Sequence, residues 1–424
     1  MKNILNKILS AGRNFNQKDI LFQKIEKNTE IREIFKSIKE FSDKSEIRYV
    51  GGCVRKILNN ETVDDIDLAT NINPQQASEA LKKNNINFYK TGIKHGTITA
   101  EINGKNFEIT SLRKDISTDG RHAEVEFSDN WHEDASRRDF TINSIYADLE
   151  GNLFDPFNGK KDLKDGKIIF IGKADKRIKE DYLRILRYIR FFLNYSSNSH
   201  DPQIKKIIKQ NISGIKIISS ERLLDELKKL VLSRGFFKIN DDQFCLEILL
   251  LIFPQLKNVS LIKNLNKYAK ANIESKDFIF LLSLMIIDET DNADYFLYKF
   301  NLSNEAKKRI KFIKNIFSKN IEKDTFSEKN LWKIFYFNNK NYLYDIINFQ
   351  ILRSKKLDNK LVKLKEFFSM KTRPVFPIKA KQLIEDYSLK EGRELGQKLK
   401  QLENVWLNNS FKISDKEINK IVNN

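Results

Sequence analysis

IRYVGGCVRKIL (47–58) and DIDLAT (65–70) are the two stretches that decide the fold of the first part of this chain. IRYV is rich in β-branched and aromatic residues, which predicts a strand that runs into two glycines and then a helix. DIDLAT predicts a second strand. Asp65 and Asp67 are two positions apart, so in a strand both carboxylates point to the same face.

The residues that follow predict more of a sheet. We expect a helix at 74–83, a strand at 87–90, and strands at 96–102 and 105–113. The last two are joined by Asn103-Gly104, a dipeptide that favours the tight turn of a β-hairpin. The first part of the chain is therefore expected to be α+β.

Glycine separates this part from a helical remainder. The chain has 424 residues and 40% apolar content, enough for more than one domain with a real core. Eleven of the 15 glycines lie at or before Gly172, and the later sequence is rich in Leu, Ile, Phe and Lys at helical spacing. We expect breaks between helices near 196–202, 234–235 and 373–377.

The charge is also uneven along the chain. The net charge is +19, yet residues 1–150 hold 23 basic and 24 acidic side chains, and residues 301–400 hold 24 basic and 11 acidic ones. A compositional bias of the whole genome would not concentrate the excess in one part. The helical part is therefore expected to bind a polyanion, with nucleic acid favoured over a membrane surface.

Cysteine and histidine argue against some classes of protein. Two cysteines cannot form a disulfide framework, four histidines make a His-rich metal site improbable, and no pair of residues has the spacing of zinc ligands. The first 17 residues are cationic but lack an unbroken apolar core, and no later run is long and uncharged enough to span a bilayer. We expect a soluble, cytoplasmic protein that does not bind membranes.

The acid pair is the first chemical signal. Two carboxylates side by side repel each other unless a cation lies between them, and Mg²⁺ with phosphate oxygens is the usual solution. Gly52 precedes a helix start, where backbone N–H groups can approach a triphosphate, and Arg55 can add a charged contact. An Asp-x-Asp sequence alone is weak evidence, because solvated loops also carry it. Here apolar neighbours place it in a half-buried strand.

Glu108 is a third candidate acid. It lies in the expected strand 105–113, with polar Thr110 on the same face. It could bind a second metal ion or accept the proton of an attacking hydroxyl. An exposed strand glutamate in an ordinary alternating pattern explains it equally well.

Two further blocks combine arginines with acids. RRDFTIN (137–143) precedes an expected strand at 142–149. In EDYLRILRYIRF (180–191) an aspartate and three arginines recur every third residue, which puts them near one face of a helix: Asp181, Arg184, Arg187 and Arg190. A solvated basic face and a site for a base edge and phosphates explain this spacing equally well.

Taken together, the blocks resemble the family of class II CCA-adding tRNA nucleotidyltransferases and bacterial poly(A) polymerases, within the polymerase-β-like nucleotidyltransferases. The matching stretches are GGCVR (51–55), DIDLAT (65–70), HGTITAE (95–101), FEITSLR (107–113), TDGRHAEVEF (118–127), RRDFTINS (137–144), DPFNGKKDL (155–163), EDYLRILRYIRF (180–191) and SSERLLDEL (219–227). They cover roughly residues 45–230, and 377–407 looks like the weaker C-terminal pattern of the family.

The resemblance implies a nucleotidyltransferase head with a small mixed β-sheet, followed by all-helical neck, body and tail domains. The implied boundaries are an N-terminal extension at 1–30, the head at 31–150, the neck at 151–235, the body at 236–330 and the tail at 331–424. The implied activity is addition of CCA to the 3′ end of tRNA from CTP and ATP.

The resemblance also implies residue roles. Asp65 and Asp67 bind catalytic Mg²⁺, Gly52 and Arg55 lie at the triphosphate, and Arg138 with Asp139 contacts the nucleotide. Asp181 and Arg184 read the base of CTP or ATP, while Arg187 and Arg190 hold phosphates. Residues 114–136 form a mobile loop that serves the change from C to A addition. One departure is Lys56, where the family commonly has Asp.

Four alternatives stay open. Within the family they are a poly(A) polymerase and a partial enzyme that adds only CC or only A; the sequence at 91–101 and the complete loop favour full CCA addition. Outside it, the chain could be a silent RNA-binding protein, although an intact acid pair argues against this. His200-Asp201 resembles the doublet of a phosphohydrolase, but no other histidine lies outside the first part of the chain to complete it.

Overall fold

The computed structural model describes residues 28–93, 96–117, 124–263, 265–317, 324–354 and 356–423. The chain divides into two compact units, Met1–Ile252 and Phe253–Asn424. The five-part division expected from the sequence is finer than this and stays a prediction. Most of the expected N-terminal extension, as well as His95, lies outside the described residues.

The first unit contains all the strands of the described chain. Its elements are α2 (Thr29–Lys39), β1 (Ile47–Val50), α3 (Gly52–Leu58), β2 (Asp67–Thr70), α4 (Pro74–Lys83), β3 (Asn87–Gly92), β4 (Thr97–Ile102), β5 (Lys105–Ser111), β6 (Arg113–Ser117), β7 (Glu124–Phe127), α5 (Trp131–Ser136), η2 (Thr141–Asn143), β8 (Tyr146–Ala147), β9 (Leu153–Phe154), α6 (Gly159–Lys164), α7 (Ala174–Glu180), α8 (Leu183–Tyr195), α9 (Pro202–Asn211), η3 (Ile212–Ile217), α10 (Ser220–Val231), η4 (Arg234–Asp241) and α11 (Gln243–Ile252).

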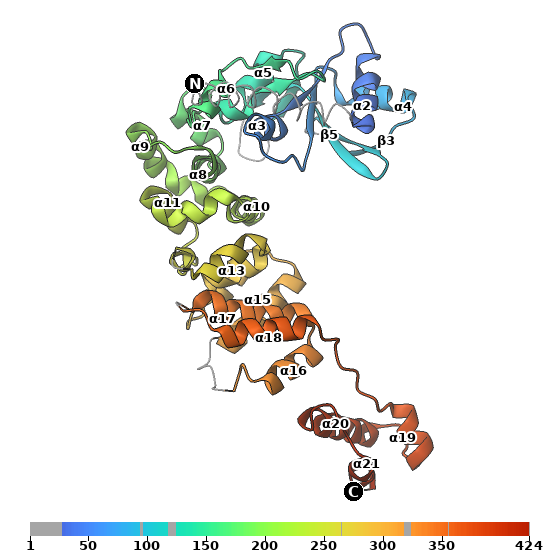
Figure 1. Ribbon diagram of the computed structural model, residues 1–424. Coiled ribbons are helices and arrows are strands. Elements are labelled where there is room, and N and C mark those ends of the chain that lie inside the picture. The colour runs from blue at the N-terminus through green and yellow to red at the C-terminus, as the bar shows by residue number, and fades with distance from the viewer. Residues whose placement is uncertain are drawn as a thin grey trace, which may run out of the picture. The chain divides into compact units, whose positions relative to one another are not determined.

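Seven strands form a mixed sheet in the order β3-β4-β5-β2-β1-β8-β9. Strands β2 and β5 run parallel, and the other neighbours are antiparallel. Helices α2 and α4 pack against each other beside this sheet (Figure 1). The α+β prediction is confirmed, and β2, which carries Asp67, lies in the middle of the sheet.

Local sequence explains why the elements begin and end where they do. Helix α4 starts at Pro74, and Asn73 and Gln76 form a capping box around its first turn. The hairpin of β4 and β5 turns at Asn103 and Gly104, whose φ angles of 54° and 74° are those of the expected tight turn. The expected helix and hairpin are both confirmed.

Three expectations about the first unit were wrong in detail. Strand β2 begins at Asp67, so Asp65 precedes the strand. The expected strand at 142–149 is a 3₁₀ turn followed by the two-residue strand β8. The segment 114–136, expected to be a loop, contains the paired strands β6 and β7 and the helix α5, while its residues 118–123 lie outside the described chain.

Helix α8 carries the expected row of arginines. It begins at Leu183, so Arg184, Arg187 and Arg190 lie on it, while Asp181 is the extended residue between α7 and α8. The placement of Asp181 on the same helix face was therefore wrong. The helix ends at Tyr195 and α9 begins at Pro202, which confirms the expected break at 196–202.

The second unit is helical throughout its described residues. Its elements are η5 (Val259–Ile262), α12 (Lys267–Asn272), η6 (Ile273–Ser275), α13 (Phe278–Ile286), α14 (Asn292–Lys299), α15 (Asn304–Phe317), α16 (Glu328–Phe337), α17 (Lys340–Arg353), α18 (Asn359–Ser369), α19 (Ala380–Tyr387), α20 (Arg393–Asn408) and α21 (Asp415–Asn423). The last three share a cluster of buried residues that includes Leu383, Leu402 and Val422. Among the described residues, no helix has the length and apolar character needed to cross a bilayer.

Candidate functional site

A polar pocket of about 570 Å³ in the first unit brings most of the expected site residues together. Its wall is formed by α3, the start of β2, the segment before η2, helix α8 and one residue of α10. The expected residues that line it are Gly52, Arg55, Asp65, Asp67, Arg138, Asp139, Asp181, Arg184, Arg187 and Arg190. Glu108 is the expected site residue that does not line it.

The acid pair lies at one side of this pocket. Within the described chain, neither the Asp65 nor the Asp67 carboxylate forms a hydrogen bond or ion pair with another residue. Desolvation raises the pKa of Asp67, Arg138 opposes this, and the neighbouring charge of Asp65 adds to it. A Cβ atom built on Gly52 would lie 3.9 Å from Asp67 Oδ2, so the glycine turn and the acid are adjacent.

Glu108 lies beside the pair. Strands β2 and β5 are in register with Asp67 opposite Glu108, and residues paired in this way project from the same face of a sheet. Glu108 is exposed. The structure therefore places it next to Asp67 and leaves its role a prediction.

The glycine turn needs glycine at its first position. Gly51 has a φ of 68° and a ψ of −113°, a conformation that residues with a side chain rarely adopt, and a Cβ there would lie 3.4 Å from Arg138 Nη1. The side chain of Arg55, one turn into α3, is buried and donates to Asn143 Oδ1. Its guanidinium lies over the ring of Phe191, 4.7 Å from the centroid.

Arg138 is held by a buried acid that lies outside the pocket wall. Asp134 is only 1% exposed and accepts from Arg138 Nη2 at 3.1 Å, from Arg137 Nε at 2.8 Å and from Tyr146 Oη at 2.6 Å. Burial alone would raise the pKa of Asp134, but Arg138 and Arg137 bring it well below its usual range. Asp134 therefore stays ionised and fixes the position of Arg138.

Asp139 connects this segment to α8. Its carboxylate is buried, accepts from Arg187 Nε at 2.6 Å and from Asn143 Nδ2 at 2.9 Å. Burial raises the pKa of Asp139, but Arg187 and the hydrogen bond from Asn143 lower it to about 2. An ionised Asp139 thus orients the Arg187 guanidinium at the pocket.

Glu226 of α10 holds the same helix from another side. It is buried, accepts from Arg190 Nε at 2.5 Å and lies 3.7 Å from Arg187 Nη1. Arg190 also lies over Phe191, 4.2 Å from the ring centroid. These contacts fix two arginines whose remaining N–H groups are available to a ligand.

The two expected base-reading residues each have another partner. Asp181 accepts from Arg222 Nη2 at 2.7 Å, and Arg184 Nη1 donates to Glu180 at 2.8 Å and to the carbonyl of Arg177 at 2.6 Å. Asp181 and Arg184 are therefore near each other on the pocket wall, but the structure does not pair them. A ligand that bonded to both would have to compete with Arg222 and Glu180.

Lys56, the departure from the family pattern, also lies on the pocket wall. Its ammonium is 3.0 Å from the exposed carboxylate of Asp64. This surface ion pair contributes little to stability. Lys56 therefore adds positive charge to the pocket rather than an acid to the helix.

Sequence reasoning missed several residues of the site. Lys229 and Phe191 line the pocket, and Asp134, Arg222 and Glu226 support it from behind. The block 219–227 was recognised, but the spacing of Arg222 and Glu226 on one helix gave no sign of which residues they contact. Asp134 is one of several acids that precede Arg137-Arg138-Asp139, and nothing in the sequence distinguishes it from the others.

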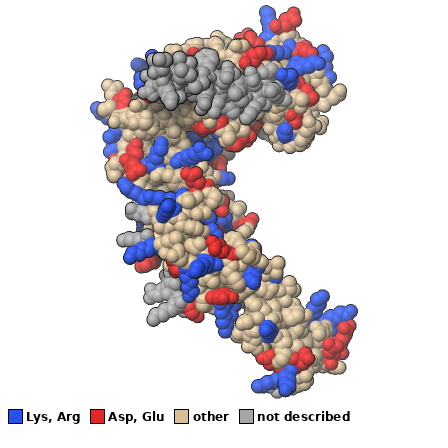
Figure 2. Space-filling model, in the orientation of Figure 1, with Lys and Arg blue, Asp and Glu red and all other residues tan. Residues whose placement is uncertain are grey.

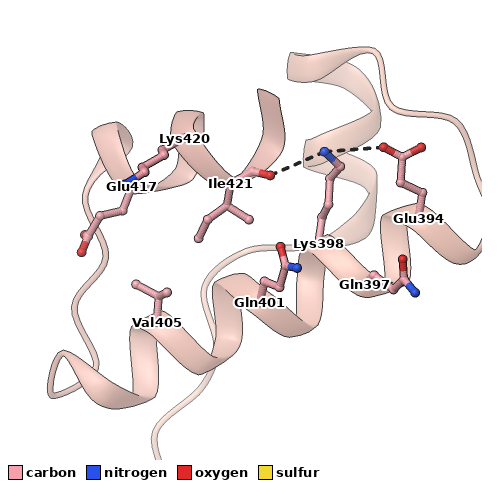
Figure 3. Close-up of a pocket in the computed structure, with 8 residues that line it drawn as sticks. All are labelled: Glu394, Gln397, Lys398, Gln401, Val405, Glu417, Lys420 and Ile421. Atoms are coloured by element: carbon pink, nitrogen blue, oxygen red, sulfur yellow. Dashed lines mark hydrogen bonds and ion pairs between the residues drawn. The ribbon is translucent and has the colours of Figure 1, made fainter. Parts of the chain in front are cut away.

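The second unit contains a different kind of pocket, lined by residues of α20 and α21 (Figure 3). Lys398 is buried there, and its ammonium donates to the carbonyl of Val422 at 2.6 Å and lies 3.5 Å from Glu394 Oε1. A cation at the last carbonyls of a helix satisfies groups that have no partner within the helix. We interpret Lys398 as a structural cap of α21.

Comparison with known proteins shows which sequence families and which solved structures the chain resembles. Residues 47–169 match the model of the poly(A) polymerase head domain, and residues 200–259 match that of the probable RNA- and SrmB-binding site of polymerase A. The crystal structure of the Bacillus stearothermophilus CCA-adding enzyme in complex with CTP superimposes with a TM-score of 0.67, at 23% identity, over 89% of this chain and 92% of that one. The fold is thus that of a poly(A) polymerase head domain, followed along the chain by helical segments.

The curated relatives that match part of the chain are named as CCA-adding enzymes. The human mitochondrial CCA tRNA nucleotidyltransferase 1 is 48% identical over 201 residues, 46% of each chain, and the CCA-adding enzyme of Listeria monocytogenes is 31% identical over 265 residues, 62% of this chain and 65% of that one. Over the matched residues, the chain is similar to CCA-adding enzymes and to the poly(A) polymerase head domain. It spans about half the length of the first curated relatives that it matches.

Proposed function

We propose that this protein adds CCA to the 3′ end of tRNA, one nucleotide at a time, from CTP and ATP and without a nucleic-acid template. The observation that carries this proposal is the single pocket that is lined both by the acid pair at the start of β2 and by the arginines of α8. The relatives in the comparisons are named for the same activity, and one of their structures holds CTP.

The acid pair fits Mg²⁺. Two adjacent carboxylates with no protein partner in the described chain offer the hard oxygen ligands that this ion prefers, and the open pocket leaves room for phosphate oxygens and water. Asp65 and Asp67 would hold the ion, with Glu108 as a third candidate. When bound, Mg²⁺ would lower the pKa of the attacking 3′-hydroxyl and neutralise charge on the departing pyrophosphate.

The chain's own residues position the two reactants. The N–H groups at the start of α3, after the Gly51 turn, can donate to phosphate oxygens. Arg138, held by Asp134, and Arg187, held by Asp139, present fixed guanidinium groups to the same pocket. Fixed donors lose little entropy when the triphosphate binds, so the α-phosphate is held in line with the 3′-hydroxyl.

Choice of the base is assigned to Asp181 and Arg184. A carboxylate and a guanidinium together can accept from and donate to the edge of cytosine or adenine. We expect Arg184→Ala to reduce the preference for CTP over GTP more than it reduces affinity for tRNA. Incorporation of each nucleotide, measured alongside tRNA binding, tests this. The control is Lys205→Ala, a change on α9 outside the pocket. An unchanged CTP/GTP ratio in Arg184→Ala would refute the base-reading role.

The basic second unit is proposed to bind tRNA. On the face drawn in Figure 2, Lys and Arg side chains are spread over its helices, with acidic residues between them. Residues 301–400 have the strongest excess of positive charge. A distributed positive surface suits recognition of RNA by phosphate contacts and shape.

One experiment distinguishes this function from its alternatives. The protein is incubated with Mg²⁺, CTP, ATP and a tRNA that lacks its 3′ end, and the ends of the products are sequenced. We expect CCA. Ends in CC or in a single A indicate a partial enzyme, a long A tract indicates a poly(A) polymerase, and unchanged ends with retained tRNA binding indicate a silent RNA-binding protein.

The structure also bears on the phosphohydrolase alternative. His200 pairs with Asp242, and Asp201 instead caps the start of α9, so the His200-Asp201 doublet does not converge as it would in a phosphohydrolase.

A cytoplasmic location is proposed from the two free cysteines. Because the human relative is named as mitochondrial, cell fractionation is the test of location.

A further inference from the structure

Three residues far apart in the sequence meet beside α8, next to Tyr188 and Phe192. His200 follows α8, while Asp242 and Cys245 lie at the start of α11. One potential ligand atom of each residue lies within 4.8 Å of the other two. No zinc-ligand spacing is visible in the sequence, because Asp242-x-x-Cys245 supplies only two ligands and His200 joins them through the fold.

We propose that His200, Asp242 and Cys245 form a zinc site that is separate from the acid pair. Imidazole nitrogen, thiolate and carboxylate are the three ligand types of zinc in proteins. Three protein ligands leave a fourth position for water.

The distances suit this ion. With the bond lengths of zinc proteins, neighbouring ligand atoms in a tetrahedral site lie about 3.3 to 3.7 Å apart. His200 Nε2 is 3.6 Å from Cys245 Sγ, and it is 2.8 Å from Asp242 Oδ2. The first distance lies in this range and the second is shorter, so Asp242 would have to move away from His200 when zinc binds.

The surroundings of His200 favour metal binding through Nε2. Its other ring nitrogen, Nδ1, lies 3.0 Å from Tyr188 Oη, and a partner at the second nitrogen is a regular feature of histidines that bind metal. In the metal-free protein Nε2–H donates to Asp242, so zinc would take the place of this proton while Nδ1–H donates to Tyr188. The ring is also stacked on Phe192 at 3.6 Å, which fixes its orientation.

The two carboxylate oxygens of Asp242 have different partners. Oδ1 accepts from the backbone N–H of Cys245 at 2.9 Å and so caps α11, while Oδ2 faces His200. The side chains of His200 and Asp242 are 8% and 21% exposed, and Cys245 is buried. Solvent therefore reaches the cluster on the side of Asp242, which provides a path for an ion and a place for its water ligand.

Bound zinc would link the loop after α8 to α11. Both Tyr188 and Phe192, which contact His200, belong to α8, the helix that carries the arginines of the pocket. The role proposed for the site is to hold these two segments together, although three protein ligands and a water are the set of open zinc sites and not of closed structural ones. Bound zinc would stabilise the helix on which the nucleotide pocket depends without taking part in the reaction.

Metal analysis of the full-length protein tests the proposal. Excess Mg²⁺ is present so that it fills sites made only of oxygen ligands, such as the acid pair, and zinc bound there is not counted. We expect about one zinc per chain after dialysis. Replacement by Co²⁺ should give the near-ultraviolet charge-transfer band of a cobalt–thiolate bond. Cys245→Ser should lose both the zinc and the band. A folded wild-type protein that retains no zinc and shows no band would overturn the proposal.

Cys53→Ser is the matched control, because Cys53 is the other buried cysteine and lies beside Asp67. This variant should keep the zinc and the band. Loss of the band would show that the metal binds Cys53 instead of Cys245, and it would overturn the proposal. Tyr188→Phe serves if Cys245→Ser does not fold. Loss of the hydrogen bond to His200 should weaken zinc affinity about 10- to 100-fold, and an unchanged affinity would contradict the assigned geometry.

Discussion

Asp67→Asn is expected to abolish incorporation of both CTP and ATP, by about a thousandfold or more. The change keeps the shape of the side chain and removes the charge that would hold the metal ion. A metal ion contributes several kcal/mol to stabilisation of the transition state, and each 1.4 kcal/mol corresponds to a factor of ten in rate. Single-nucleotide incorporation on a tRNA without its 3′ end measures the effect.

The same variant should remain folded. The pKa of Asp67 is raised by desolvation, with the charge of Asp65 adding to the increase. For an acid whose pKa is raised in the folded state, ionisation at neutral pH opposes folding, so an uncharged asparagine does not lower the thermal midpoint. Binding of tRNA should also be unchanged, because the charge lost does not belong to the proposed tRNA surface.

Asp64→Asn is the control for this variant. Asp64 is next to Asp65 and is exposed, and it does not line the pocket, although its partner Lys56 does. Its variant should incorporate both nucleotides at nearly the normal rate. Normal activity in Asp67→Asn would exclude the metal role, and an equal loss in Asp64→Asn would show that the assay reports a general effect of charge.

Asp134→Asn is expected to produce the largest loss of stability, about 3 to 5 kcal/mol in the unfolding of the first unit. Asp134 is the shared acceptor of Arg137, Arg138 and Tyr146, and its variant leaves two largely buried guanidinium groups without their counter-charge. Urea unfolding followed by tryptophan fluorescence suits the measurement, since Trp131 packs against Tyr146.

The loss should depend on pH in a defined direction. The pKa of Asp134 is lowered in the folded protein, so its stabilising effect is fully present above the unfolded pKa of about 3.9 and declines as the pH falls further toward the folded value. The difference between the wild type and Asp134→Asn should therefore be constant from pH 5 to 8, as the unfolded pKa implies, and shrink in stronger acid. Asp129→Asn, an exposed change in the same segment, should unfold like the wild type. A wild-type midpoint for Asp134→Asn would contradict the role of Asp134.

Much of the head could be predicted from the sequence because its signals are local. Asn103-Gly104 defines a turn by backbone preference alone, and Pro74 with its capping asparagine defines a helix start. The arginines of α8 were predicted to share a helix because their spacing of three is itself a helical property. Family resemblance then supplied the order of the blocks.

Contacts between distant segments could not be predicted in this way. Nothing in the spacing of Glu226 shows that it binds Arg190, 36 residues earlier, or that Arg222 rather than Arg184 is the partner of Asp181. The start of β2 was misplaced because Asp65 and Asp67 satisfy an alternating pattern whether or not both belong to the ladder. The cluster of His200, Asp242 and Cys245 depends on the packing of α8 against η4 and α11, which no single segment encodes.

The central position of β2 in the sheet has a consequence for the order in which the head is assembled. Its backbone is paired on one side with β1 and on the other with β5, which begins 38 residues after Asp67. Such non-local pairing forms late in folding and opens only with large-scale unfolding. During synthesis the acid pair therefore lacks its fixed neighbours until the chain has been made through β5. An incomplete head cannot hold the arrangement on which the proposed chemistry depends.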